Sequence, residues 1–269
     1  MKMLKYPILL VHGMGFRDSR IINYWGRIPK IFTDEGNEVF YGNQDSNGTI
    51  EDNASALKSR IEEIMSETGV EKLNVIAHSK GGMDMRYAIC QLGINRYVAS
   101  LTTISTPHNG SKSIDKVLKL PKPLVKFAGD CSDIWLRLQG DRNPNAYKVF
   151  LSFSTDYTNR FNKENPDDPN IYYQSYACVM KNSASDILMC ISHAIVNLVE
   201  GENDGLLTPE SVKHGDFKGI VRSNSGRGIS HCDEVDMRRH RFTKKQGEGV
   251  SDILDMYREI LQTLRDKGM

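Results

Sequence analysis

The chain has 269 residues, of which 39% are hydrophobic and 26% charged, and its formal net charge is +1. A chain of this length and composition is expected to fold as a globular protein with a sizeable core. The small net charge creates no strong field toward nucleic acid or an anionic membrane, so neither is an expected partner. No apolar run approaches the roughly 20 residues that a membrane-spanning helix needs.

The start of the chain and its cysteines indicate the cellular compartment in which the protein is expected. The apolar run at residues 7–11 is too short for a secretory signal peptide, and no small-residue cleavage site follows it. The cysteines are odd in number and scattered, and they form no C-x-x-C pair: Cys90, Cys131, Cys178, Cys190 and Cys232. These features predict a cytoplasmic protein with reduced thiols. The alternative, a secreted protein, requires a leader that has been removed.

Strand and helix patterns alternate through the first 104 residues. Residues 7–11 form an uninterrupted apolar run before a Gly-rich loop, which is typical of a strand buried on both faces. Helical spacing and terminal glycines predict helices between further short strands. The predicted order is strand 7–11, helix 28–32, strand 38–41, helix 54–64, strand 73–77, helix 83–92 and strand 101–104. This alternation predicts an α/β fold with a mostly parallel sheet covered by helices on both faces.

The pattern changes after residue 110. Residues 111–170 contain five prolines, no clear strand, and an apolar cluster among lysines that comprises Val117, Leu118, Leu120, Leu124, Val125 and Phe127. This segment is expected to be a helical cap inserted within a single domain that spans residues 1–269. Strand patterns return at residues 171–180 and, weakly, at 219–221. An amphipathic helix over residues 253–264, capped by Ser251, is expected to end the chain.

The stretch VIAHSKGG, residues 75–82, places Ser79 between a predicted strand and a predicted helix. Ala77 and Gly81, two residues before and after the serine, are small enough for a sharp strand-to-helix turn. Such a turn exposes the hydroxyl, as in the G-x-S-x-G nucleophile elbow. A serine hydroxyl is a poor nucleophile at neutral pH, so it needs a base and an acid that orients the base. In this kind of fold the three follow the chain order Ser, acid, His.

Seven histidines are candidates for the base. His231 lies on a loop after the last weak strand, which is where the base is expected. Three others come too early in the chain: His12, His78 and His108. His193 lies in an apolar stretch, where packing inside a helix is expected. His214 and His240 lie among charged residues, where solvent exposure is expected.

The acid must lie between the nucleophile and the base. Asp204, in the loop ENDGLL, has this place in the chain. An Asp-Gly pair by itself indicates only a turn, and Asp186 and Asp233 are alternative acids.

An attacked carbonyl also needs two backbone N–H donors for its developing oxyanion. One is expected from Lys80, the residue after the serine, and the other from Met14 in the Gly-rich loop HGMG. Neither side chain is required for this role.

Five motifs of this chain occur in the same order in a known enzyme family: LLVHGMGF, AHSKGG, STPHNGS, NDGLLTPES and SHCDEVD. By these motifs the chain resembles, over nearly its whole length, the bacterial triacylglycerol lipases and esterases of the α/β-hydrolase fold. The resemblance implies a serine carboxylic-ester hydrolase that acts on a small-molecule or lipid acyl ester, with residues 111–170 as cap or lid. It implies Ser79 as nucleophile, Asp204 as acid, His231 as base, and Met14 and Lys80 as oxyanion donors.

Some members of that family hold a structural calcium ion through an aspartate two residues after the catalytic histidine. Asp233 occupies this position, and Asp186 is a candidate partner. The alternative is that Asp233 and Glu234 only flank the loop and cap local backbone. No cofactor is expected to be required, and the calcium ion is not claimed.

Other functions remain open at this level. An acyltransferase or a thioesterase would use the same triad, because only the acceptor or the leaving group differs. A catalytically silent binding module would be favoured by a missing triad member, and none is missing. For the ester hydrolase we expect soluble esters with acyl chains of about four to ten carbons, since each buried CH₂ contributes roughly 0.8 kcal/mol until the pocket is full. Oligomeric state is not predicted.

Overall fold

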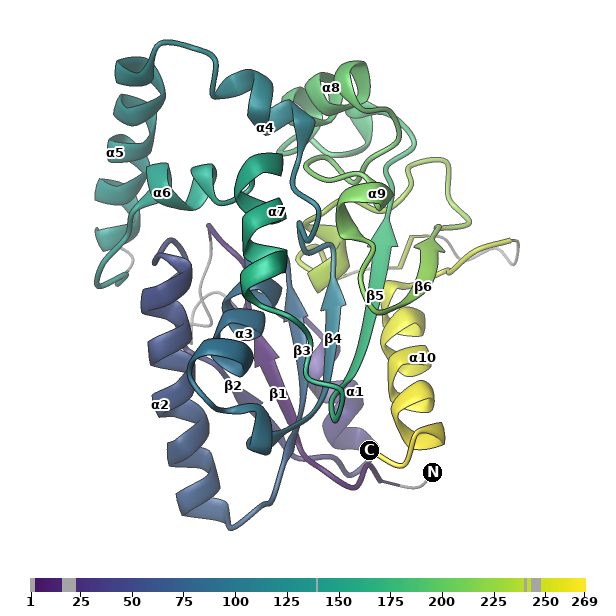
Figure 1. Cartoon of the computed structure of the whole chain (residues 1–269). Coiled ribbons are helices and arrows are strands. Elements are labelled where there is room, and N and C mark those ends of the chain that lie inside the picture. Colours follow the sequence, from purple (N-terminus) through teal and green to yellow (C-terminus); the bar gives the residue numbers. More distant parts are fainter. Residues whose placement is uncertain (1–2, 16–22, 139, 240, 243–247) are drawn as a thin grey trace.

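The computed structural model describes residues 3–15, 23–138, 140–239, 241–242 and 248–269. Within these residues, six strands form one parallel sheet in the order β2-β1-β3-β4-β5-β6 (Figure 1). The strands are β1 (Ile8–Val11), β2 (Val39–Tyr41), β3 (Leu73–His78), β4 (Val98–Ile104), β5 (Tyr172–Cys178) and β6 (Asp216–Val221). Because the strands are parallel, their carboxyl ends meet at one edge, where a site built from the following loops is expected.

Helices cover both faces of the sheet, as the alternation of elements predicted (Figure 1). Ile8 and Leu10 of β1 pack in the core cluster that contains residues of α1 and α10, whereas Leu9 and Val11 pack in the cluster of α2 and α3. Burial of both faces explains why the β1 sequence is apolar without interruption. The covering helices are α1 (Ile28–Asp34), α10 (Ile253–Asp266), α2 (Ile50–Thr68) and α3 (Lys80–Gln91).

The chain between β4 and β5 is helical, in agreement with the pattern at residues 111–170. Its described residues form four helices and no strand: α4 (Lys112–Val117), α5 (Lys122–Leu138), α6 (Ala146–Leu151) and α7 (Thr155–Glu164). Helices α4, α5 and α6 lie beyond the carboxyl ends of the strands (Figure 1). They therefore lie at the edge of the sheet where a functional site is expected.

Helix α8 (Cys190–Val199) and the short α9 (Pro209–Val212) complete the fold, with 3₁₀ turns η1 (Asn95–Tyr97), η2 (Ser183–Ser185) and η3 (Asp233–Val235). Several predicted boundaries are wrong: α2, β4 and β6 begin before the predicted residues, and two further cases have a local cause. Helix α3 begins at Lys80, because its first turn follows the serine directly. Helix α10 is capped by Asp252 and not by Ser251: the Asp252 carboxylate accepts from the Leu254 N–H, and Asp255 completes a capping box.

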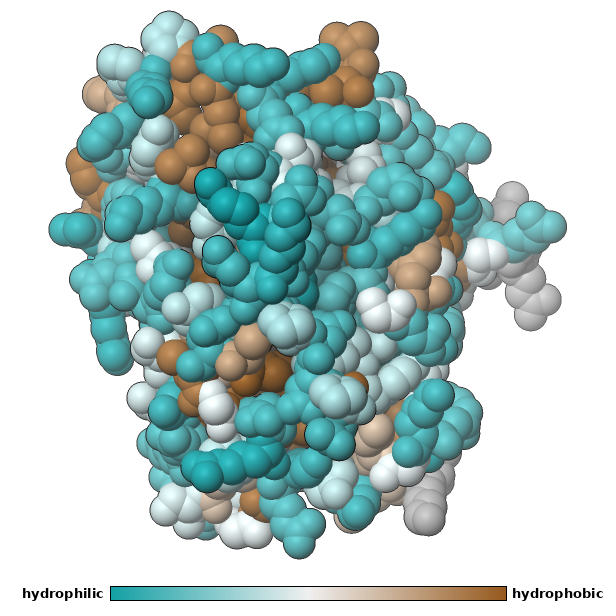
Figure 2. Space-filling model, viewed as in Figure 1, coloured by the Kyte–Doolittle hydropathy of each residue, from teal (hydrophilic) through white to brown (hydrophobic). Residues whose placement is uncertain are grey.

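Large apolar side chains are exposed on α5 and around α8, and Figure 2 shows brown areas at this end of the molecule. Phe127 and Leu138 of α5 are 68% and 79% exposed, and Ile187 and Leu198, beside and within α8, are 87% and 88% exposed. Contiguous exposed apolar surface is unusual and marks surfaces that meet something apolar. None of the helices in the described ranges combines the length and apolar character needed to cross a membrane.

Four cysteines have free thiols: Cys90, Cys178, Cys190 and Cys232. The side chain of Cys131 lies outside the described part of the chain. None of these four is joined in a disulfide, and their reduced state stays a prediction.

Candidate active site

Ser79 occupies the corner between β3 and α3. Its backbone angles, φ 54° and ψ −130°, are sparsely populated by residues that carry a side chain, and such strain is common at functional sites. The corner also crowds its neighbours. A Cβ atom on Gly81 would come within 2.5 Å of the His12 carbonyl oxygen, and one on Gly13 within 2.7 Å of the Cβ of Ser79. The small residues around the serine are therefore required by close approach, as in a nucleophile elbow.

Asp204 and His231, 27 positions apart, are in direct contact. Nδ1 of His231 lies 2.8 Å from Oδ2 of Asp204, and Oδ1 accepts from the N–H groups of Leu206 and Leu207, each at 2.8 Å. Burial raises the pKa of Asp204, but His231 and these two N–H groups lower it by more, so the carboxyl is ionised at neutral pH. An ionised acceptor keeps the imidazole proton on Nδ1 and leaves Nε2 available to accept another.

The expected oxyanion donors, Met14 and Lys80, are both close to Ser79. Met14 lines the same cavity as Ser79. Lys80 is the first residue of α3, so its N–H is one of those that have no acceptor inside the helix. Its side chain is only 1% exposed, and Nζ bonds both carboxylate oxygens of Asp84 at 2.6 and 2.8 Å. This buried ion pair leaves only the backbone of Lys80 for a ligand in the cavity.

A cavity of about 290 Å³ opens beside Ser79 and His231, and its lining is mostly apolar. The segment between β4 and β5 contributes Ile114, Phe150 and Phe153 to its wall. The apolar cluster noted in the sequence does not line this cavity in the part that the structure describes, and the side chain of Leu124 lies outside that part. The three-residue spacing of Phe150 and Phe153 is the signal that could have identified the wall. The remaining apolar lining comes from Pro107, Met189, Leu206, Leu207, Val235 and Met237.

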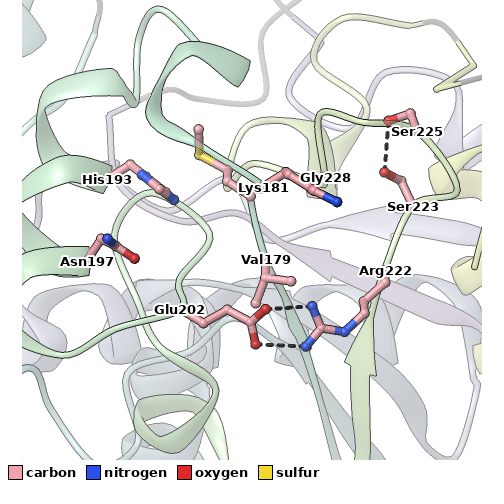
Figure 3. Close-up of a pocket in the computed structure, with 10 residues that line it drawn as sticks. Val179, Lys181, His193, Asn197, Glu202, Arg222, Ser223, Ser225 and Gly228 are labelled. Atoms are coloured by element: carbon pink, nitrogen blue, oxygen red, sulfur yellow. Dashed lines mark hydrogen bonds and ion pairs between the residues drawn. The ribbon is translucent and has the colours of Figure 1, made fainter.

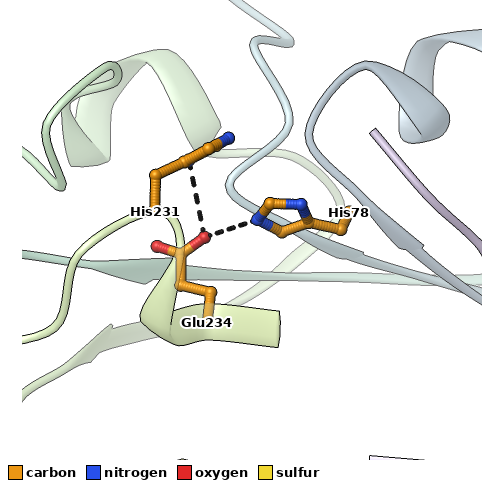
Figure 4. A group of neighbouring side chains, drawn as sticks. All are labelled: His78, His231 and Glu234. Atoms are coloured by element: carbon orange, nitrogen blue, oxygen red, sulfur yellow. Dashed lines mark hydrogen bonds and ion pairs between the residues drawn. The ribbon is translucent and has the colours of Figure 1, made fainter. Parts of the chain in front are cut away.

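A second acidic residue, Glu234, lies beside His231 (Figure 4). Its Oε2 atom lies 2.9 Å from Nε2 of His78 and 3.6 Å from Nδ1 of His231. Its Oε1 atom accepts from the Ser105 hydroxyl at 2.8 Å. The sequence interpretation assigned Glu234 no role beyond the loop, and its spacing of three residues from His231 is the only signal in the sequence.

His78 extends this network to the Gly-rich loop that contains Met14. Nδ1 of His78 lies 2.6 Å from the Tyr24 hydroxyl oxygen, which accepts from the Gly13 N–H at 3.0 Å. With its proton on Nε2, His78 would accept from the Tyr24 hydroxyl at Nδ1 and donate to Glu234. A continuous buried chain of hydrogen bonds therefore joins the histidine loop to the Gly-rich loop.

Burial sets the charges in this network. It raises the pKa of Glu234 well above its usual range, and the charge of Asp204 raises it further. It lowers the pKa of His78 well below its usual range, with the charge of His231 adding to the effect. Glu234 and His78 are therefore neutral at neutral pH, and Asp204 carries the charge.

The side chains of His78, His231 and Glu234 also have the proximity of a metal site, because their ligand atoms lie within 4.8 Å of one another. Each of these ligand atoms already has a hydrogen-bond partner. Nδ1 of His231 contacts Asp204, and Nε2 of His78 contacts Glu234. The three residues fit a closed hydrogen-bond network better than a metal site.

Asp186 and Asp233, the alternative acids and candidate calcium ligands, both face Arg238. Nη2 of Arg238 lies 2.6 Å from Oδ2 of Asp186, and Nη1 lies 3.5 Å from Oδ2 of Asp233. The hydroxyl of Ser230 donates to Asp186 at 2.5 Å. Calcium takes about six to eight oxygen ligands, and here a guanidinium lies between the two carboxylates. These residues therefore do not fit a calcium site.

The other histidines can be compared with their expected environments. His193 is 5% exposed in α8, which confirms the predicted packing inside a helix. His214 was expected to be solvated, and it is only partly so: its side chain is 16% exposed, its Nε2 lies 2.9 Å from Asp167, and its ring stacks on His108 with centroids 4.2 Å apart. The rings of His108 and Tyr173, which partly cover it, are distant in sequence. His240 lies outside the described residues.

A larger cavity, of about 430 Å³, adjoins the loop that precedes Asp204 (Figure 3). Glu202 and Arg222 both line it and bond each other directly at 2.6 and 2.7 Å, so their charges are paired. Among the described residues that line it are Lys181 and His193, but neither Ser79 nor His231. The smaller cavity, which contains the serine and the histidine, is therefore the candidate substrate site.

A parallel sheet with a serine on a strand-to-helix corner and a buried Asp–His pair after it defines an α/β-hydrolase. Residues 7–219 match the family described as palmitoyl protein thioesterase. The chain is 31% identical over 261 residues to triacylglycerol lipase 2 of Saccharomyces cerevisiae, a match that covers 92% of this chain and 74% of the relative. It is 34% identical over 119 residues to a triacylglycerol lipase of Burkholderia plantarii, which covers 42% and 32% of the two chains.

Solved structures give the same fold at lower identity. A metagenomic carboxyl esterase superposes with a TM-score of 0.74 at 14% identity and covers 99% of this chain and 77% of its own. Staphylococcus hyicus lipase superposes with a TM-score of 0.69 at 16% identity and covers 98% and 96%. The chain therefore belongs to the family that the palmitoyl protein thioesterase model describes and, with its yeast relative, to the lipases and esterases of the α/β-hydrolase fold. It is a carboxylic ester hydrolase.

Proposed function

We propose that Ser79, His231 and Asp204 form the catalytic triad of this ester hydrolase, with the N–H groups of Met14 and Lys80 as its oxyanion hole. The observation that carries the proposal is the 2.8 Å contact between His231 and Asp204, on a histidine that shares a cavity with Ser79. This contact orients the imidazole and leaves its second nitrogen available for the serine proton.

In the proposed mechanism, His231 removes the proton of the Ser79 hydroxyl as the oxygen attacks the acyl carbonyl. The N–H groups of Met14 and Lys80 stabilise the oxyanion of the tetrahedral intermediate. His231 then gives its proton to the leaving alcohol, the ester C–O bond breaks, and the acyl group stays on Ser79. A water deprotonated by His231 attacks the acyl-enzyme, the acid leaves, and the serine regains its proton. Asp204 stabilises the imidazolium in both steps.

The proposed substrates are acyl esters of short to medium chain length. The cavity of about 290 Å³ lies just below the roughly 300–1,000 Å³ typical of ligand pockets, which supports a short acyl chain. Ile114, Phe150 and Phe153 would then contact the acyl group, so the segment at residues 111–170 would act as a cap over it. Turnover of p-nitrophenyl esters of increasing chain length tests this directly: kcat/KM should reach its maximum between about four and ten carbons, with about 0.8 kcal/mol gained per CH₂ up to that point.

The place where the enzyme meets its substrate is a separate question. A cytoplasmic location stays a prediction from the sequence. The exposed apolar side chains on α5 and near α8 would also suit an enzyme whose cap binds a lipid surface. Activity measured on both sides of the solubility limit of the substrate separates the two cases.

A thioesterase is the second candidate, because the family model that matches residues 7–219 is described by that activity. The triad would act identically, and only the leaving group would be a thiol. Comparing kcat/KM for butyryl-CoA with that for p-nitrophenyl butyrate, and for S-butyryl thiocholine with butyryl choline, tests the alternative. We expect the oxygen ester of the matched choline pair to be the better substrate.

A further inference from the structure

We propose that Arg238 is a built-in cation that holds the histidine loop in its active position, at a place where a bound metal ion would otherwise be needed. Three oxygen atoms converge on its guanidinium: Oδ2 of Asp186 at 2.6 Å, Oδ2 of Asp233 at 3.5 Å, and the carbonyl oxygen of Ser185 at 3.4 Å. Carboxylate and carbonyl oxygens are the ligands that hard cations such as calcium prefer. The side chain of Arg238 supplies the positive charge that such a group of oxygens requires.

The two carboxylates belong to segments that both reach the substrate cavity. Asp233 lies two residues after His231 and is 6% exposed. Asp186 is 2% exposed and lies three residues before Met189, which lines the cavity. By bridging the two carboxylates, Arg238 fixes one segment relative to the other, so it acts on the reaction through the position of His231.

Ser230 joins these groups to the base itself. Its hydroxyl donates to Asp186 at 2.5 Å and accepts from the Asp233 N–H at 3.2 Å. Its own N–H donates to Asp233 at 3.3 Å. Because Ser230 directly precedes His231, a shift of either carboxylate changes the backbone that carries the imidazole.

The charge balance explains why a cation is needed here. Burial raises the pKa of Asp186, but the Ser230 hydroxyl, the Leu188 N–H and Arg238 lower it by more, so its carboxyl is ionised at neutral pH. Removing one partner of a buried ion pair leaves an uncompensated charge, which is strongly destabilising. Without Arg238, Asp186 and Asp233 would repel each other unless another cation took its place.

Arg227 provides a matched control. Its Nε atom donates to the carbonyl of Ser185 at 3.1 Å, so it lies at the same corner as Arg238. In the described part of the chain its hydrogen bonds go to Ser185 and Ser225 and to no carboxylate. Arg227→Ala therefore removes a guanidinium from this corner without exposing Asp186 or Asp233 as unpaired charges.

The test compares wild type, Arg238→Ala and Arg227→Ala with EDTA, with calcium chloride and with guanidinium chloride, each cation at about 10 mM so that even a weak site is filled. For wild type and Arg227→Ala, neither EDTA nor calcium should change the Tm or kcat. For Arg238→Ala, kcat should fall about tenfold or more with little change in KM, because the position of the base is lost and the pocket remains. Calcium or guanidinium should then restore kcat at least about threefold, and calcium should raise the Tm of this variant alone by several degrees.

The activity measurements rest on the proposed function, whereas the Tm measurements do not, so the two can fail separately. Loss of Tm in wild type on addition of EDTA would contradict the proposal, as would wild-type kcat and Tm in Arg238→Ala. A defect in Arg238→Ala that neither cation reduces would also contradict it. If Arg238→Ala folds only when calcium is added, the proposal is supported. If it folds neither with nor without calcium, Arg238→Lys is the deciding variant. The lysine variant should fold and retain kcat within about tenfold of wild type, since it keeps the cation, and failure to fold would contradict the proposal.

Discussion

The carboxyl group of Glu234 lies 2.9 Å from Nε2 of His78, although 156 residues separate the two in sequence. This contact places a second buried carboxyl group 3.6 Å from the Nδ1 atom of His231, which Asp204 contacts at 2.8 Å. Two carboxyl groups so close cannot both ionise easily, and their surroundings separate their pKa values in opposite directions. The site therefore distinguishes a charged acid, Asp204, from a neutral one, Glu234.

Neutrality of Glu234 leads to a prediction for its amide variant. Glu234→Gln keeps a neutral group of the same shape beside His78, so kcat should fall by less than about tenfold. Asp204→Asn instead removes the charge that holds the proton on Nδ1 of His231, and kcat should fall by about 10⁴-fold. Steady-state kinetics of both variants on one ester checks the contrast, and their Tm values are compared to show that both are folded. Equal losses in the two variants would mean that Glu234 is ionised in the working enzyme.

Stability should depend on pH through the same residue. The pKa of Glu234 in the folded protein is raised well above the value of about 4.3 for an unfolded chain. Its contribution to stability is complete below about pH 4.3 and is lost as pH rises toward the folded pKa, because the unfolded chain releases a proton that the folded chain keeps. Glu234→Gln removes this titration, so the Tm of the variant minus that of wild type should increase from about pH 5 to about pH 9. A difference that falls over this range would contradict the assignment.

The identity of the acid can be tested against its two sequence-level alternatives. Asp204→Asn should lower kcat by orders of magnitude with little change in KM, since the imidazole tautomer is wrong while the cavity remains. Asp186 and Asp233 contact Arg238 and not the imidazole. Any loss of kcat in Asp186→Asn or Asp233→Asn should therefore be accompanied by a lower Tm. If Asp186→Asn or Asp233→Asn lowers kcat like Asp204→Asn at an unchanged Tm, the acid has been assigned to the wrong residue.

Substrate preference is the fourth test. Hydrolysis of tributyrin should exceed that of triolein, because a cavity of about 290 Å³ is filled by a short acyl chain. Activity should rise smoothly through the solubility limit of tributyrin, without a jump. A sharp increase above that limit, with triolein as the better substrate, would show that an interface stabilises an open state of the segment at residues 111–170. The exposed apolar side chains of α5 and α8 would then be its binding surface.

Much of the fold was predictable because its signals are local. The uninterrupted apolar run of β1 reflects burial on both faces, and the small residues around Ser79 reflect close approach at one corner. The ends of helices were less predictable where two neighbouring residues could each act as the cap. Ser251 and Asp252 are both good caps, and only the contact of Asp255 with the backbone of Asp252 decides between them.

The parts of the site that were missed depend on contacts between distant segments. Nothing near His78 in the sequence indicates that its two ring nitrogens contact Tyr24 and Glu234. Likewise, Asp186 and Asp233 can be identified as candidate cation ligands from spacing. The cation that they contact is the side chain of Arg238, and the sequence pattern gives no sign of this contact. Burial and charge then set the pKa of each group, and neither is visible in the sequence pattern.

The central claim is that Ser79 is the nucleophile, and labelling with a fluorophosphonate tests it most directly. The probe should form one covalent adduct with wild type, on the peptide that contains Ser79, and none with Ser79→Ala. That variant should fold with a Tm close to or above that of wild type, because it removes only one hydroxyl from a strained corner. Its ester turnover should fall to a residual roughly 10³–10⁴-fold above the uncatalysed reaction. An adduct on another residue, or full activity in Ser79→Ala, would contradict the account.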